Sequence, residues 1–254
     1  MPGSMIAAQL YTLRASLKTP EDIAQTLPKV REVGYEAVQL SGLGPIGKKE
    51  LKKLLDENGL TCCATHEPYE RLVKEPEAVA EEHAILECRY TACPALSKEM
   101  RNEAGFHEAA KTLSDAGKKL AEAGVTLTYH NHSFEFARFD GRLGLEIIYD
   151  ESDPQFLQGE IDTYWVQHGG GSPAAWCRRL KHRLPLVHLK DMGIIDGKQT
   201  YVEIGEGNLD WPDILAACRE SGTGWYIVEL DTCPREPLES LRISIENLRK
   251  MGLQ

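Results

Sequence analysis

Strand-like and helix-like segments alternate along nearly the whole chain, and this alternation is the strongest constraint on its fold. Short apolar runs typical of buried strands lie at residues 6–11, 37–41, 60–66, 88–96, 125–130, 156–162, 184–190 and 224–230. Helical patterns follow most of them, at residues 20–33, 48–58, 101–123, 173–183 and 236–251, with at least one helix within 69–87 and a short one near 143–150.

Eight strand-helix units in 254 residues match the size and pattern of one (β/α)8 barrel. The sequence therefore predicts an α/β fold, with a single TIM-barrel domain over residues 1–254. A doubly wound open sheet is the alternative, but no glycine-rich phosphate loop follows the first predicted strand.

Composition narrows the class of protein. The formal charge of −10 disfavours a surface for nucleic acid or an anionic bilayer. No apolar run approaches the ~20 residues that cross a membrane, so we expect no membrane association. The seven cysteines are an odd number and form no C-x-x-C pair, which is typical of reduced thiols in a cytoplasmic protein.

Four successive predicted strands, from the fifth to the last, end in residues that can bind metal or transfer protons. Because the carboxyl ends of parallel strands meet at one face of a barrel, we expect these residues to share one site. They are His130 and His132 with Glu135 shortly after, Asp162, His188 with Lys190, and Glu229 with Asp231.

Each candidate also has a purely structural interpretation. An Asp at a strand end often caps the next helix, so Asp162 alone is ambiguous. His188 alone is compatible with a hydrogen-bonded core histidine. Glu229 is compatible with a buried carboxylate neutralised by a lysine such as Lys190. For His132 the alternative is support of a neighbouring ligand, and for His66 and Gln9 it is loop capping.

Several motifs, in order along the chain, resemble the sugar phosphate isomerase/epimerase family, which shares its barrel with xylose isomerase and endonuclease IV. They are QLYTLR at 9–14, YHNHSFEF at 129–136, DTYWV at 162–166, HLKD at 188–191, EIGEG at 203–207, LDW at 209–211 and VELD at 228–231. The resemblance implies a metal-dependent enzyme acting on a small sugar, keto-sugar or cyclitol, in a chain that often forms homo-oligomers. We expect an isomerase or epimerase working through an enediolate-like intermediate.

The resemblance also implies one divalent ion, most often manganese, held by a Glu, an Asp, a His and a second Glu. Matched by motif, the last three are Asp162, His188 and Glu229. The chain departs from the pattern at the first Glu, because His130 stands at the end of the fifth strand. We predict that Glu135 supplies this ligand, with His130 as the alternative. Zn, Co, Fe and Mg are alternatives to Mn.

The expected chemistry assigns roles to further residues. A divalent ion stabilises an enediolate as a Lewis acid, while Glu229 or Glu135 moves the carbon-bound proton. His130 or His132 then handles a hydroxyl proton, and Lys190 holds a developing oxyanion or a substrate oxygen. The residues expected to line the sugar site are Gln9, Gln39, His66, Trp165 and Trp211, the two tryptophans offering an apolar face to a sugar ring.

Other functions stay open. Within the family, a dehydratase or lyase acting on inosose or 3-keto-glycosides is the main alternative. The departure at His130 also allows a sugar-binding barrel without catalysis. An endonuclease IV-like DNA repair enzyme needs a richer His/Glu set for three metals and a basic groove, which the acidic balance disfavours. No obvious phosphate site marks the chain. EIGEG predicts a tight turn anchored near the site by Glu203 or Glu206, or a plain solvated turn.

Overall fold

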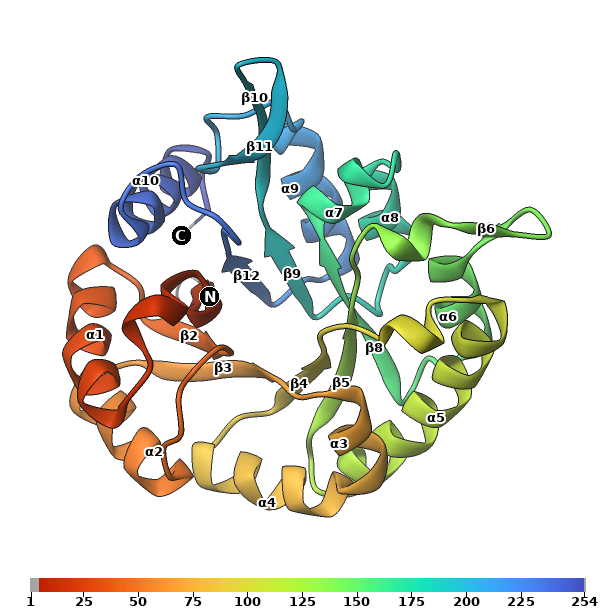
Figure 1. Cartoon of the computed structure of the whole chain (residues 1–254), viewed down its shortest axis with the longest axis horizontal. Helices are drawn as coiled ribbons and strands as arrows, with labels where there is room; N and C mark the ends of the chain where they lie inside the picture. The colour runs from red at the N-terminus through yellow and green to blue at the C-terminus, as the bar shows by residue number, and fades with distance from the viewer. Residues whose placement is uncertain (1–4, 254) are drawn as a thin grey trace.

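The computed structural model describes residues 5–253, and within them eight parallel strands close into a barrel (Figure 1). β1 pairs with β2 on one side and with β12 on the other, which closes the ring. The predicted α/β barrel is therefore confirmed. In chain order the barrel strands are β1 (Ile6–Gln9), β2 (Ala37–Leu40), β3 (Thr61–His66), β4 (Tyr90–Cys93), β5 (Thr126–His130), β8 (Leu157–Asp162), β9 (Leu186–Leu189) and β12 (Trp225–Val228).

Helices surround the strand ring on the outside (Figure 1). They are α1 (Pro20–Val33), α2 (Lys48–Glu57), α3 (Tyr69–Lys74), α4 (Pro76–Leu86), α5 (Glu103–Glu122), α6 (Gly144–Glu151), α7 (Thr163–His168), α8 (Pro173–Arg179), α9 (Trp211–Ser221) and α10 (Pro237–Lys250), with 3-10 turns at η1 (Leu10–Ser16), η2 (Lys98–Met100) and η3 (Phe134–Phe136). None of the helices in this part of the chain combines the length and apolar character needed to span a bilayer.

Helix α1 illustrates how local sequence sets these elements. Thr19 and Asp22 form a reciprocal capping box at its start, and a proline occupies its first turn. One face is buried against the barrel through Ile23, Leu27 and Val30. The helix ends at Gly34, whose φ of 114° is accessible to glycine at little cost.

The interior of the barrel changes from apolar to polar along the strands. Small apolar side chains fill its amino-terminal part: Ala7, Ala37, Cys63, Ala64, Leu186 and Ile227. Two residues further along four of these strands, on the same strand face, stand Gln9, Gln39, His188 and Glu229. The polar side chains therefore gather at the carboxyl end of the barrel. Six of the seven cysteines are buried free thiols.

Some boundaries differ from the predicted ones. The first strand ends at Gln9, because the chain turns into η1, and the predicted helix 173–183 ends at Arg179. The segment 69–87 contains two helices, and α7 was not predicted. Two short hairpins were also missed: β6–β7 (Arg138–Phe139 and Arg142–Leu143) and β10–β11 (Asp191–Ile195 and Lys198–Val202).

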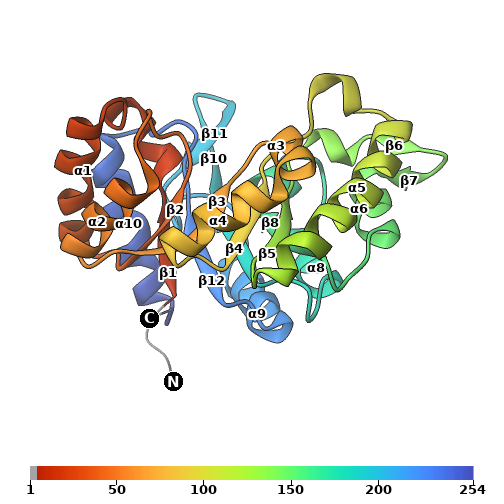
Figure 2. The same ribbon diagram turned by 90° about the horizontal axis from the view of Figure 1, so that it is seen from below.

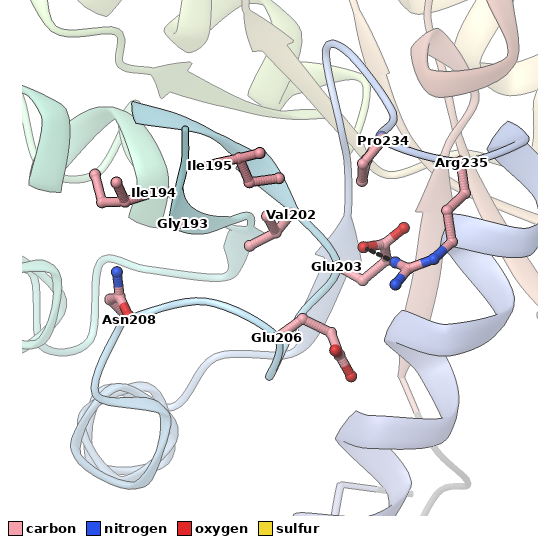
Figure 3. A pocket seen from close by; sticks show the side chains of 9 residues that line it. All are labelled: Gly193, Ile194, Ile195, Val202, Glu203, Glu206, Asn208, Pro234 and Arg235. Carbon is pink, nitrogen blue, oxygen red and sulfur yellow. Dashed lines mark ion pairs between the residues drawn. The ribbon is translucent and has the colours of Figure 1, made fainter. Parts of the chain in front are cut away.

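Hairpin β10–β11 projects from one end of the barrel (Figure 2). It follows β9 directly, so this is the end where the strands finish. Its tip turns through Asp196 and Gly197, both at positive φ, and exposes Ile194 and Ile195. A hollow of about 500 Å³ lies between this hairpin and the segment that follows β12 (Figure 3).

Candidate metal and substrate site

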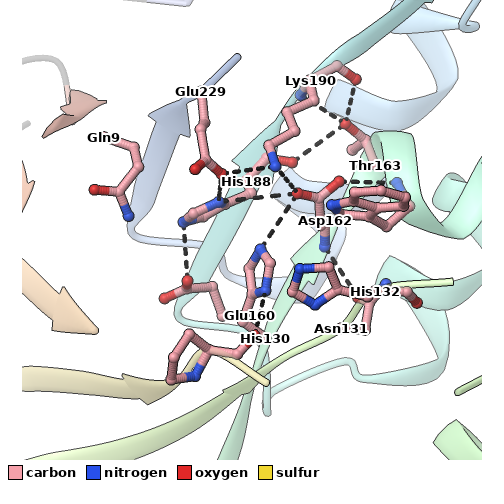
Figure 4. Close-up of polar contacts among 12 residues, drawn as sticks. Gln9, His130, Asn131, His132, Glu160, Asp162, Thr163, His188, Lys190 and Glu229 are labelled. Atoms are coloured by element: carbon pink, nitrogen blue, oxygen red, sulfur yellow. Dashed lines mark hydrogen bonds and ion pairs between the residues drawn. The ribbon is translucent and has the colours of Figure 1, made fainter. Parts of the chain in front are cut away.

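Four side chains converge inside the barrel at the carboxyl ends of β5, β8, β9 and β12 (Figure 4). His130 Nε2 lies 3.3 Å from Asp162 Oδ2, and His188 Nδ1 lies 2.9 Å from Glu229 Oε2. One donor atom from each of the four residues lies within 4.8 Å of the other three. All four side chains are buried, so their donor atoms face one another rather than bulk water.

Backbone contacts hold Asp162 in this position. One of its oxygens, Oδ1, accepts a hydrogen bond from Trp165 N and so caps α7, while Oδ2 faces the cluster. Its own N–H donates to Asn131 Oδ1 at the end of the neighbouring strand. Asp162 is therefore both a helix cap and a member of the site, and the two interpretations are compatible.

Lys190 adds a cation to the same cluster. Its Nζ lies 3.0 Å from Asp162 Oδ2, 2.8 Å from Glu229 Oε2 and 2.7 Å from Asp231 Oδ2. Lys190 is only 1% exposed, so these ion pairs form away from water. The lysine offsets part of the negative charge that the carboxylates bring into the barrel.

Burial and charge act in opposite directions on this cluster. Burial alone would lower the pKa of His188, but the neighbouring carboxylates of Glu160 and Glu229 raise it to about 10. Burial would raise the pKa of Asp162 and of Glu229, yet Lys190 and the adjacent histidines hold both pKa values below the usual range. Both carboxylates are therefore ionised at neutral pH.

The donor set fits a divalent ion. Zinc lies roughly 2.0–2.2 Å from nitrogen and oxygen ligands arranged as a tetrahedron, so neighbouring donors around such an ion are about 3.3–3.6 Å apart. The donor pairs His188–Glu229, His130–Asp162 and His188–Asp162 are 2.9, 3.3 and 3.9 Å apart, which brackets this spacing. Two imidazole nitrogens and two carboxylate oxygens suit Zn or another borderline ion, and Mn tolerates the same set.

Beside this cluster lies a pocket of about 280 Å³, smaller than the hollow at hairpin β10–β11 but lined by the chemically active groups. It is open to His66, His130, His132, Lys190 and Glu229, and also to Tyr11, Ser41, Pro94, Ala95 and Asp231. Burial lowers the pKa of His66, and it lowers that of His132 to about 2. Both rings are therefore neutral at pH 7 and serve as hydrogen-bonding groups.

The structure does not bring Glu135 into this cluster, contrary to the sequence-based choice of ligand. Its carboxylate accepts hydrogen bonds from Tyr129 Oη, 2.8 Å away, and from the backbone N–H of His132. The cause is the 3-10 turn η3 after β5, which holds the Glu135 carboxylate against these two donors. Of the two alternatives, His130 is the one whose side chain joins Asp162, His188 and Glu229.

Trp211 also lies away from the pocket. Its indole Nε1 donates to Asp191 Oδ2, and the side chain is buried. It therefore offers no free face to a sugar ring. Trp165 lies behind two residues of the pocket lining, with its ring 5.2 Å from that of His132 and 5.8 Å from Lys190 Nζ. Trp165 Nε1 and His132 Nδ1 are buried without a hydrogen-bond partner among residues 5–253.

Gln9 and Gln39 form a layer beneath the pocket rather than part of its lining. Gln9 Nε2 donates to Gln39 Oε1 over 2.9 Å, and Gln39 Nε2 donates to Glu160. Both glutamines are fully buried. Sequence reasoning missed Glu160, although it stands two residues before Asp162 and so lies on the same face of β8. That spacing was an available signal.

Asp191 organises the EIGEG segment. Its carboxylate accepts hydrogen bonds from the backbone N–H groups of Gly205, Gly207 and Leu209, in addition to the indole of Trp211. Glu203 points the other way, to Ser240 and to Arg235 in the hollow at hairpin β10–β11 (Figure 3). EIGEG is thus a tight turn held by Asp191, and Glu203 anchors it to the outer helix layer rather than to the metal cluster.

Comparison with known proteins agrees with this architecture. Rhizopine catabolism protein MocC of Rhizobium meliloti is 27% identical, over 91% of this chain and 82% of that protein. An inosose dehydratase of Clostridium botulinum is 21% identical, over 85% of each chain. A crystal structure of a sugar phosphate isomerase/epimerase from Parabacteroides distasonis aligns with a TM-score of 0.82 and 25% identity, over 98% of this chain and 94% of that one.

A structure of L-ribulose 3-epimerase shares the fold, with a TM-score of 0.74 and 16% identity. The family profile described as xylose isomerase-like TIM barrel matches residues 27–251. The match covers most of the chain, and it confirms the resemblance drawn from the motifs. The protein belongs to the xylose isomerase-like TIM barrel family.

Proposed function

We propose that this protein is a divalent-metal-dependent enzyme that removes a proton from the carbon next to a carbonyl group in a small keto-sugar or keto-cyclitol. The observation that carries the proposal is the buried group of His130, Asp162, His188 and Glu229 beside an open pocket. Return of the proton to the neighbouring carbon makes the enzyme an isomerase, and its return to the opposite face of the same carbon makes it an epimerase. These are the functions we favour. Loss of a neighbouring hydroxyl group instead gives a dehydratase.

The side chains of the pocket support this chemistry. A divalent ion held by the four residues would supply Lewis-acid stabilisation of the oxyanion that develops on the substrate. Glu229 is ionised and lines the pocket, so it is the base that accepts the carbon-bound proton. Lys190 reaches a substrate oxygen from the same edge by exchanging its contact with Asp231, the most exposed of its three carboxylate partners, for the substrate. The neutral rings of His66 and His132 orient hydroxyl groups.

Charge favours an unphosphorylated substrate. Among the described lining residues, Lys190 is the cationic side chain, and its ammonium group already contacts three carboxylates. A phosphate group would therefore meet more negative than positive charge. A neutral hydroxyl suits the partnerless nitrogens better, since it can accept from Trp165 Nε1 and donate to His132 Nδ1.

The dehydratase remains the second candidate, because curated relatives of this chain include inosose dehydratases. The two reactions share the first proton transfer and differ in the product. Loss of water beside a carbonyl produces a conjugated enone with ultraviolet absorption, whereas isomerisation or epimerisation keeps the molecular formula.

Proton exchange with solvent tests the proposal before the substrate is identified. The Mn-loaded protein is incubated in D2O with a panel of keto-sugars and keto-cyclitols, and deuterium incorporation is followed by mass spectrometry. We expect exchange with at least one compound, at least 100-fold slower in Glu229→Gln and unchanged in Glu203→Gln, a buried carboxylate outside the pocket. If no compound of the panel exchanges or binds, the proposal is refuted, and the protein has a function that does not involve these sugars.

A further inference from the structure

Glu160 lies directly beneath the metal-binding group and touches two of the histidines at the site (Figure 4). Its Oε1 is 2.9 Å from His188 Nε2 and 2.6 Å from His66 Nε2. Gln39 Nε2 donates to both of its oxygens, over 3.2 and 3.0 Å. The carboxylate is fully buried, and its hydrogen-bonding partners within residues 5–253 are the nitrogens of these three side chains.

These contacts decide which nitrogen of His188 is free to bind a metal ion. Nε2 faces two acceptors, Glu160 Oε1 and the side-chain oxygen of Gln39 at 2.5 Å, and so carries a hydrogen. The opposite nitrogen, Nδ1, faces Glu229 and Asp162, and a metal ion bound among these carboxylates would take the place of the hydrogen that Nδ1 shares with them. A metal ion needs an unprotonated nitrogen, and a carboxylate on the far nitrogen is the usual device that provides one.

The same oxygen orients His66. Its Nε2 hydrogen points down to Glu160, and its ring stacks on that of His188 with an interplanar angle of 12° and 5.3 Å between ring centres. Since His66 also lines the pocket, its other nitrogen is left for a ligand. One buried carboxylate therefore sets the orientation of a metal-facing and of a pocket-facing imidazole.

We propose that Glu160 is a positioning residue that fixes the Nε2–H tautomer of both His188 and His66, presenting Nδ1 of the first to a metal ion and Nδ1 of the second to the substrate. The inference rests on the proposed metal-dependent function. Gln9 and Gln39 support this arrangement. Gln9 donates to Gln39 Oε1, which fixes the Gln39 amide with its oxygen towards His188 and its nitrogen towards Glu160.

Glu160→Gln is the sharpest perturbation because it keeps the size of the side chain, removes its charge and turns one of its two acceptor oxygens into a donor. With its oxygen towards His66 and His188, the new amide would place its N–H group against Gln39 Nε2, which also donates. A Gln39 amide that turns to relieve this clash presents its own N–H group to His188 Nε2, which favours a hydrogen on Nδ1 and blocks the metal-facing nitrogen. Glu203→Gln is the matched control, since Glu203 is an equally buried carboxylate held by Ser240 and Arg235.

The test is a Co²⁺ titration followed by visible absorption, with competition by a chelator of known affinity. We expect Glu160→Gln to bind roughly 10–100-fold more weakly than the wild type with a shifted spectrum, and Glu203→Gln to bind within twofold. If Glu160→Gln keeps the wild-type affinity and spectrum while the wild type binds one ion, the inference about Glu160 is overturned and the proposed function stands. If the wild type binds no metal, both are overturned.

Imidazole ¹⁵N chemical shifts of the Zn-loaded wild type provide a second measurement that needs no variant, should Glu160→Gln fold poorly. We expect a hydrogen on Nε2 of His188 and of His66. A hydrogen on Nδ1 of His188 would refute the positioning role whatever the variant does.

Discussion

Replacement of Lys190 by methionine is the perturbation whose cost follows most directly from the structure. The ammonium group lies 2.7–3.0 Å from oxygens of Asp162, Glu229 and Asp231, and the residue is almost completely buried. Methionine fills a similar volume but leaves these carboxylates without their cation. Removing one partner of a buried ion pair costs about 3–5 kcal/mol, because the remaining charge stays buried.

We expect the loss to fall on Asp162 and Glu229, since the side chain of Asp231 is 25% exposed and partly screened by water. For a protein of this size each kcal/mol corresponds to about 2–4 °C in Tm, so the predicted decrease is about 6–20 °C. The assay is thermal unfolding of chelator-treated protein, checked by urea titration. Lys52→Met is the control, because Lys52 pairs with Asp56 and Glu87 at the surface, where water screens the ion pairs, so this substitution should lower Tm much less.

A divalent ion at the same carboxylates should reverse much of this loss. The increase in Tm on adding saturating Mn²⁺ is therefore predicted to be larger in Lys190→Met than in the wild type. A metal-free variant as stable as Lys52→Met would refute the assignment of Lys190 as the cation that neutralises the cluster. A metal-induced increase no larger than that of the wild type would contradict the placement of the ion among these carboxylates.

Three further changes test other parts of the structure. Burial raises the pKa of Glu135 from 4.5 to about 8, so the folded protein holds a proton there that the unfolded chain has lost between these pH values. Stability should accordingly decrease as pH rises through this window, by up to about 1.4 kcal/mol per pH unit, and Glu135→Gln should remove that slope in urea titrations; equal slopes would contradict it. Trp211→Phe should destabilise the protein by about 1–3 kcal/mol, because it removes the indole hydrogen bond to the charged carboxylate of Asp191, while ligand affinity stays unchanged; a selective loss of affinity would instead indicate that Trp211 contacts the ligand. Asp162→Asn keeps the acceptor that caps α7, so the variant should remain folded with a modest decrease in Tm, whereas its affinity for Co²⁺ should decrease strongly in a titration. Wild-type affinity would exclude Asp162 as a ligand.

The fold was predictable because each barrel strand carries its own apolar run and the units repeat. The positions of Asp162, His188 and Glu229 followed from the same regularity, since residues at the ends of parallel strands must meet. The hairpins were missed although each contains an Asp-Gly pair, at Asp140–Gly141 and Asp196–Gly197, with all four residues at positive φ. An Asp-Gly pair inside a predicted loop is a strong signal of a two-residue hairpin turn, so both hairpins were predictable.

The side chains that lie away from the predicted site do so for a different reason. Whether Glu135 reaches the cluster depends on the path of the chain after β5, which periodicity does not describe. There the carboxylate finds two local donors, Tyr129 Oη and the N–H of His132, and stays below the site. Trp211, at the start of α9, was likewise placed by a partner 20 residues away, Asp191, which the strand pattern does not reveal. Glu160, in contrast, was recoverable from the alternation along β8.

Metal stoichiometry and affinity in three proteins test the central claim most directly: the wild type, His130→Ala and Glu135→Gln, each measured by elemental analysis and by Mn²⁺ titration. The structure predicts about one equivalent in the wild type, at least a tenfold loss of affinity in His130→Ala and wild-type binding in Glu135→Gln. A wild-type protein that takes up no divalent ion, or one that loses it through Glu135→Gln and keeps it in His130→Ala, would contradict the account.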